Sequence, residues 1–100
     1  MDRYLTVTAN YTGSCIQDDY VGEINLKNLN LKFEFLNELS LWNEEYKKII
    51  PLSDQERLSL IKKIDKLDEW GINISKKLMD LFPNSKIRYY SEGKLKYLNL

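Results

Sequence analysis

The sequence predicts a two-layer α+β domain, with a three-stranded antiparallel sheet covered on one face by an antiparallel helical hairpin. Three observations indicate this fold class: an alternating apolar segment near the start, apolar residues at helical spacing through the middle, and a hairpin pattern at the end. Residues 1–100 are expected to form a single domain, because chains of this length bury one core and seldom two.

The first strand is expected over residues 4–11, YLTVTANY, because apolar side chains alternate there with polar ones. One face of this strand would carry Leu5, Val7, Ala9 and Tyr11. Gly13 interrupts the pattern, and weak periodicity over residues 12–30 predicts a long ordered loop. A short strand within 21–26 is an alternative for part of that loop.

Two helices are expected next. The first starts near Phe33 and ends at Pro51, with an apolar stripe formed by Phe35, Leu39, Trp42, Tyr46 and Ile49. Residues 53–56, SDQE, form a capping box that begins the second helix. The stripe that follows, from Leu60 to Leu81, has no break in its spacing. We therefore predict one long helix from about Asp54 to Phe82, stopped by Pro83.

Gly71 lies on the apolar stripe of this long helix, where glycine costs about 1 kcal/mol relative to alanine. Our interpretation is that the neighbouring helix, or its Trp42, passes too close for a side chain. The alternative is a simple kink.

The last segment, KIRYYSEGKLKYL, is typical of a hairpin with strands at 87–90 and 95–98 and a turn at 91–93. Tyr89 and Tyr90 would point to opposite faces, so that one packs inward and the other is available for contact. The two helices should pair antiparallel across the short connection at Pro51. The third segment would then return near the end of the first strand and run antiparallel to it.

Composition excludes several kinds of catalytic and metal site. The chain has no histidine, which removes histidine triads, histidine-dependent ribonuclease chemistry and zinc sites with histidine ligands. One cysteine cannot build a thiolate zinc site, and Cys15, without a histidine to activate it, is expected to be a small, partly buried residue. The four glycines stand too far apart for a phosphate loop. We predict that the protein is not an enzyme and takes no cofactor, although catalysis by carboxylates alone stays open.

Charge and hydropathy limit the partners. The chain has 15 basic and 15 acidic residues; residues 1–50 hold three more acids than bases, and residues 51–100 three more bases than acids. A nucleic-acid binder usually has a clear basic excess. No apolar run reaches the roughly 20 residues of a membrane span, and the start lacks the apolar core of a secretory signal. We expect a cytoplasmic protein with no direct nucleic-acid contact, no membrane and no small-molecule substrate.

The segment SCIQDDYVGE, residues 14–23, is the first candidate binding surface. Its acids do not have the spacing of an EF-hand loop, so no metal site is predicted. Tyrosine beside acids on an anchored loop favours contact with a partner protein, and the alternative is a solvated loop. We predict that the centre of the surface consists of Asp18, Asp19, Tyr20 and Glu23.

A second acidic patch is predicted on the long helix, where acids surround a tryptophan: Asp65, Asp68, Glu69 and Trp70. The alternative is an ordinary solvated helix face. Tyr90 of the C-terminal hairpin is the remaining candidate contact residue.

Two longer segments together resemble a known family. They are EINLKNLNLKFEFLNELSLWNEEYKKI and LDEWGINISKKLMDLFPNSKIRYYSEG, with the acidic–aromatic loop from Gln17 to Tyr20 before them. In this order they are similar to small bacterial immunity proteins of contact-dependent growth inhibition and other polymorphic toxin systems. The chain departs from that family at the start of the first helix, where Asn30 or Lys32 stands in place of a capping residue.

The resemblance implies a cytoplasmic protein that binds and neutralises a cognate toxin domain. A nuclease-like toxin is expected, because an acidic loop can occupy the basic cleft that receives phosphates. The alternative is a small adaptor or regulatory module that binds a cellular partner and no toxin.

Overall fold

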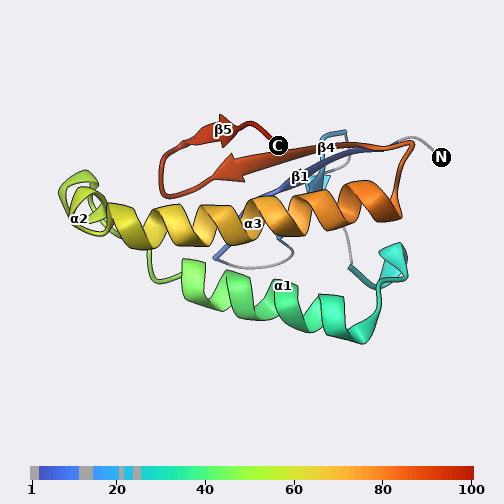
Figure 1. Cartoon of the computed structure of the whole chain (residues 1–100), viewed down its shortest axis with the longest axis horizontal. Helices are drawn as coiled ribbons and strands as arrows, with labels where there is room; N and C mark the ends of the chain where they lie inside the picture. The colour runs from blue at the N-terminus through green and yellow to red at the C-terminus, as the bar shows by residue number, and fades with distance from the viewer. Residues whose placement is uncertain (1–2, 12–14, 21, 24–25) are drawn as a thin grey trace.

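The described residues, 3–11, 15–20, 22–23 and 26–100 of a computed structural model, form an α+β domain with a mixed sheet (Figure 1). In this part of the chain five strands share one sheet, in the order β3-β2-β1-β4-β5. Their bounds are Tyr4–Val7 for β1, Ile16–Asp18 for β2, Gly22–Glu23 for β3, Lys86–Ser91 for β4 and Lys96–Leu98 for β5. β1 runs parallel to β4, and the other neighbouring strands pair antiparallel.

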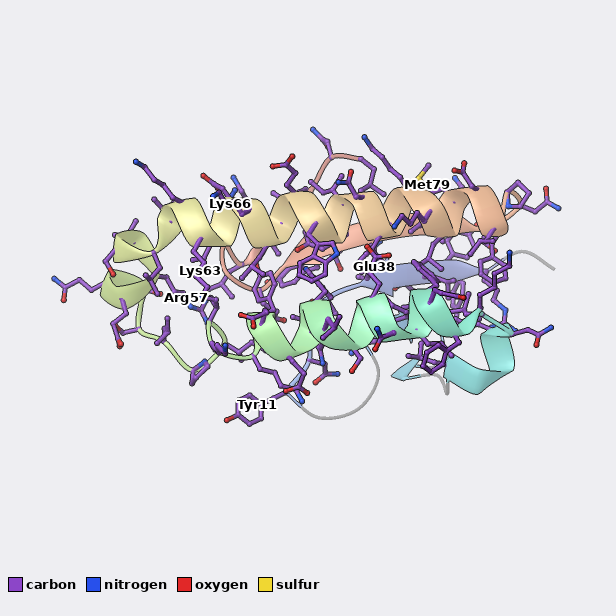
Figure 2. The ribbon with its side chains drawn as sticks, turned by 60° about the horizontal axis from the view of Figure 1, so that its bottom comes forward. Tyr11, Glu38, Arg57, Lys63, Lys66 and Met79 are labelled. Carbon is purple, nitrogen blue, oxygen red and sulfur yellow. The ribbon has the colours of Figure 1, made fainter. Side chains whose placement is uncertain are left out.

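The helices lie together on one face of this sheet, with α1 and α3 side by side in front of it in Figure 2. A short 3-10 helix, Leu26–Leu29, leads into the three α-helices: α1 is Phe33–Tyr46, α2 is Asp54–Ser59 and α3 is Ile61–Leu81. α1 and α3 run in opposite directions (Figure 1), which confirms an antiparallel helical pair. No helix of the described chain has both the length and the hydropathy of a membrane span.

The predicted three-stranded antiparallel sheet is wrong in strand number and in one orientation. β2 arises inside the segment that was expected to be a loop, whereas β3 lies within residues 21–26, where a short strand was the alternative. β2 carries the chain back to the end of the sheet where β1 began, so α1 starts there and runs in the direction of β1 (Figure 1). After the antiparallel pair α1 and α3, β4 must then run parallel to β1.

The single long helix predicted over 54–82 is also wrong, because the chain leaves helical geometry at Leu60, with φ −110° and ψ 21°. The capping box is confirmed: the Ser53 hydroxyl accepts from the Glu56 amide at 3.3 Å, and the Glu56 carboxylate accepts from the Ser53 amide at 3.2 Å. Arg57 donates to the carbonyls of Ile50 and Glu92, at 2.7 and 2.9 Å. These bonds hold α2 against the two neighbouring turns and out of line with α3.

The core lies between the sheet and the helices. Leu5, Val7 and Ile16 face it from the sheet, and Trp42 of α1 is fully buried, with its indole Nε1 donating to the carbonyl of Leu67 at 2.9 Å. Core positions are therefore predicted correctly for α1 and for Leu5, Val7 and Ala9. The prediction is wrong for Tyr11, because β1 ends at Val7 and the Tyr11 side chain is exposed.

The close packing predicted at Gly71 is confirmed, but the neighbour is not the first helix or Trp42, as was expected. A Cβ at this position would overlap the ring of Tyr89, which comes from β4 and not from α1. α3 therefore approaches the sheet closely at this point, and Tyr89 is buried as one of the two adjacent tyrosines was expected to be.

Candidate functional site

The face of the sheet opposite the helices carries tyrosines and charged side chains, and we call it the open face. Alternation along the strands places these side chains there, since Thr6 is in register with Gln17 and Arg88, and Tyr90 with Tyr97. We define the open face by Tyr4, Thr6, Thr8, Gln17, Asp19, Tyr20, Lys86, Arg88, Tyr90, Glu92 and Tyr97.

Asp19 occupies the middle of the open face, and both of its carboxylate oxygens are engaged. Oδ1 accepts from the Thr6 hydroxyl at 2.7 Å, and Oδ2 accepts from the Arg88 guanidinium at 3.0 Å. The same guanidinium lies over the ring of Tyr97, 4.4 Å from its centroid. These contacts connect the turn after β2 to strands β1, β4 and β5, so the charged centre of the face is fixed in place.

Two pairs of tyrosines stand on either side of this centre. Tyr4 and Tyr20 meet edge to face with ring centroids 5.3 Å apart, and Tyr90 and Tyr97 do so at 5.0 Å. Tyr20 is 79% exposed. Tyrosine and arginine are the residues that contribute most often to the centres of protein interfaces, and the open face presents both on a rigid sheet.

The open face is hollowed in two places that share Asp19. The larger hollow, of about 470 Å³, lies among Tyr4, Tyr20 and the start of β4. The smaller, of about 280 Å³, is lined by Thr6, Thr8, Ala9, Asn10, Gln17, Asp19, Tyr90, Glu92 and Tyr97. A partner surface can therefore insert side chains on both sides of the ion pair between Asp19 and Arg88.

The structure brings three of the predicted contact residues together on the open face: Asp19, Tyr20 and Tyr90. Asp18 has a different role, because its Oδ1 accepts from the amide of Tyr20 at 2.9 Å and shapes the turn. Glu23 belongs to β3, and its side chain lies outside the described part of the structure. The described part of SCIQDDYVGE thus forms β2, a turn and β3, and Asp18 and Asp19 are already bonded within the protein.

The predicted second acidic patch does not form one surface. Asp68 is only 2% exposed, because it lies on the packed stripe of α3 between Leu67 and Gly71. Asp65 is an exposed residue paired with Lys94 at 2.7 Å, and this ion pair raises the pKa of the lysine. Glu69 is exposed on the helix layer, away from the open face.

Trp70 packs against α1 and is not free for a partner. Its indole Nε1 donates to Glu38 at 3.0 Å, and Lys77 pairs with the same carboxylate at 2.7 Å. Partial burial raises the pKa of Glu38, but the bonds from Lys77 and Trp70 outweigh it, so the pKa lies below its ordinary value.

Asp68 is the centre of a buried polar network that the sequence did not reveal. Its Oδ1 accepts from the hydroxyls of Tyr46 and Tyr89, at 2.7 and 2.6 Å, and its Oδ2 accepts from Ser91 at 2.8 Å. Burial raises the pKa of both tyrosines, and the neighbouring carboxylate raises it further. The network joins α1, α3 and β4, so we assign it to stability.

Cys15 is buried. The sequence predicted a small, partly buried thiol with no activating partner. Burial raises the pKa of this thiol to about 11. The group is therefore protonated at neutral pH and unsuited to nucleophilic chemistry. Among the described residues, no cluster of acidic or thiol side chains is arranged to hold a metal ion.

Arg88 and Tyr97 are the functional candidates that sequence reasoning missed. A signal was present, because alternation along KIRYYSE puts Arg88 on the same face as Tyr90. The predicted contact residues were acids and aromatic residues, so this arginine was not among them.

The chain matches no protein-family model and no curated protein. Function is therefore inferred from the open face and from the resemblance seen in the sequence.

Proposed function

We propose that the protein is an immunity protein, which binds a cognate bacterial toxin domain through the open face and neutralises it in the cytoplasm. The observation that supports this most is a sheet face of paired tyrosines and a fixed arginine, with both long helices on the other side. Neutralisation by binding needs a rigid exposed surface and no catalytic group, so we propose no enzymatic activity.

The charges of the open face favour a protein over nucleic acid as the direct partner. The open face carries two acids, Asp19 and Glu92, and two bases, Lys86 and Arg88, so acids and bases are in balance on it. Binding to phosphates would call for a basic excess. A mixed face rich in tyrosine fits the polar and aromatic composition of protein interfaces.

We further propose that the toxin domain is nuclease-like. Asp19 and Glu92 both line the smaller hollow, so the acidic side of the open face is concentrated at one place. A nuclease binds its substrate with basic side chains, and such side chains complement an acidic hollow. In this arrangement the protein would cover the groove that the nucleic acid needs.

An immunity protein is expected to be encoded beside its toxin, so the test is co-expression with a toxin domain from a neighbouring gene, followed by co-purification and a growth assay. The wild type should form a complex and restore growth. Tyr20→Ala and Tyr97→Ala should each weaken binding by at least about tenfold, since truncated aromatic anchors at interface centres cost about 2 kcal/mol or more.

Tyr11→Ala is the matched control, because Tyr11 is also well exposed, at 59%, but projects beside α1 and away from the open face (Figure 2). Its affinity should equal that of the wild type. Equal affinity of all three variants would remove the open face from the interface. A complex with a cellular protein, and none with the toxin domain, would support the adaptor alternative.

A further inference from the structure

The smaller hollow of the open face has the chemistry of a cation site. Its lining includes two carboxylates, Asp19 and Glu92, and two aromatic rings, Tyr90 and Tyr97. No lysine or arginine is among its described lining residues. Carboxylates and aromatic faces both attract positive charge, and together they favour a flat, delocalised cation over a compact one.

The protein already holds one guanidinium at the edge of this hollow. Arg88 donates to Asp19 Oδ2 at 3.0 Å and lies over Tyr97 at 4.4 Å. One carboxylate and one aromatic ring are the contacts that arginine uses when it binds in interfaces. Asp19 and Tyr97 also line the hollow, so both are positioned to contact a second guanidinium there.

Two further groups in the hollow have capacity to accept hydrogen bonds. The carboxylate of Glu92, which is half-buried, has no ion pair within the described residues. Thr8 is only 7% exposed, and within the described part of the chain its hydroxyl makes one 3.5 Å contact, to the carbonyl of Ala9. That distance is at the limit for a hydrogen bond. A buried hydroxyl bonded this weakly is expected to gain a partner when a donor enters the hollow.

We propose that this hollow binds a guanidinium group, presented as an arginine side chain by the partner protein. The identity of the partner rests on the proposed function, but the chemistry of the hollow does not. Arginine fits better than lysine, because its planar group can donate to Glu92 and Asp19 while it stacks on a tyrosine ring.

The experiment is an NMR titration of the isotopically labelled full chain with N-acetylarginine amide. We expect saturable shifts at Thr8, Tyr90, Glu92 and Tyr97, with a Kd in the millimolar range. N-acetylcitrulline amide, which has nearly the same shape without the charge, should bind at least about tenfold more weakly, because charge-assisted bonds are about twice as strong as neutral ones. Equal binding of the two compounds, or shifts centred elsewhere, would overturn the proposal.

Glu92→Gln provides the second measurement. Within the described residues the Glu92 carboxylate forms no hydrogen bond or ion pair, so the variant should fold normally and lose at least about fivefold in arginine affinity. Glu69→Gln is the matched control, since Glu69 is an exposed glutamate of α3, and its affinity should be unchanged. Equal loss in both variants would also count against the hollow.

The outcomes separate this inference from the proposed function. Arginine binding without a toxin complex would retain the hollow as a guanidinium site and reject the immunity function. A toxin complex that is sensitive to Tyr20→Ala, without any arginine binding, would retain the function and reject the hollow.

Discussion

Replacing Asp68 by alanine is expected to lower the free energy of unfolding by about 4 kcal/mol. Three hydroxyl donors would lose their acceptor, those of Tyr46, Tyr89 and Ser91. Ser91 can compensate in part, because its Oγ also lies 3.2 Å from the Tyr46 hydroxyl. Two uncompensated buried donors at roughly 1–3 kcal/mol each give the expected range, and the middle of that range is about 4 kcal/mol.

Urea and thermal unfolding of the purified variants measure this effect. A loss of about 4 kcal/mol corresponds to a Tm lower by roughly 16–32 °C in a domain of this size. Asp68→Asn should cost less, about 1–2 kcal/mol, because the amide oxygen still accepts from both tyrosines. Asp65→Asn is the control, since this exposed side chain forms a surface ion pair with Lys94 that is worth at most about 1 kcal/mol.

A cost below about 1 kcal/mol for Asp68→Ala, equal to that of the Asp65 control, would refute the reasoning. Asp68 would then have no essential part in joining the two layers. Its place among the candidate functional residues would have to be reconsidered.

Four further predictions concern stability and reactivity. Gly71→Ala should cost about 1–3 kcal/mol in urea unfolding because its Cβ would overlap the Tyr89 ring, and an unchanged midpoint would contradict the packing. Burial raises the pKa of Tyr46 and Tyr89, so the folded chain holds their protons more tightly than the unfolded chain. Their contribution to the free energy of unfolding should therefore be fully present below about pH 10 and fall as the pH rises further. Urea midpoints at several pH values would show this fall. With a thiol pKa of about 11, Cys15 should react with a thiol reagent at pH 8 about a hundredfold more slowly than in urea, and equal rates would place it at the surface. Leu95 is exposed with φ 56°, so Leu95→Gly should keep or raise the Tm, and a clear fall would show that its side chain supports the fold.

The parts of the fold that sequence predicted are those with several residues of regular spacing. β1, α1 and the C-terminal hairpin have clear alternation or a clear apolar stripe, and the capping box at Ser53 has a local sequence signature. β2 and β3 have three and two residues, too few to leave a periodic pattern. The wrong orientation predicted for β4 followed from missing β2, because one additional strand reverses the direction in which the rest of the chain runs.

Only part of the site could be predicted, for a related reason. Alternation shows that a strand has two faces, but the face that the helices cover depends on the whole topology. Asp19, Tyr20 and Tyr90 were found because acids and tyrosines stand out in a sequence, whereas Arg88 gains its meaning only from its contacts with Asp19 and Tyr97. The acceptor role of Asp68 depends on donors more than twenty residues away, which no local pattern records.

Strand β4 connects the stability of the core to the geometry of the open face. Tyr89 and Ser91 point inward to Asp68, while the alternate residues of the same strand point outward. The turn that follows is held from the inside, because the Gly93 amide donates to the Tyr46 hydroxyl at 2.9 Å and the Lys94 amide to Ser91 at 3.0 Å. A turn fixed in this way restricts the backbone of Glu92 before any ligand arrives. Because a restricted site loses less conformational entropy on binding, the buried network contributes to recognition at the hollow without touching the ligand.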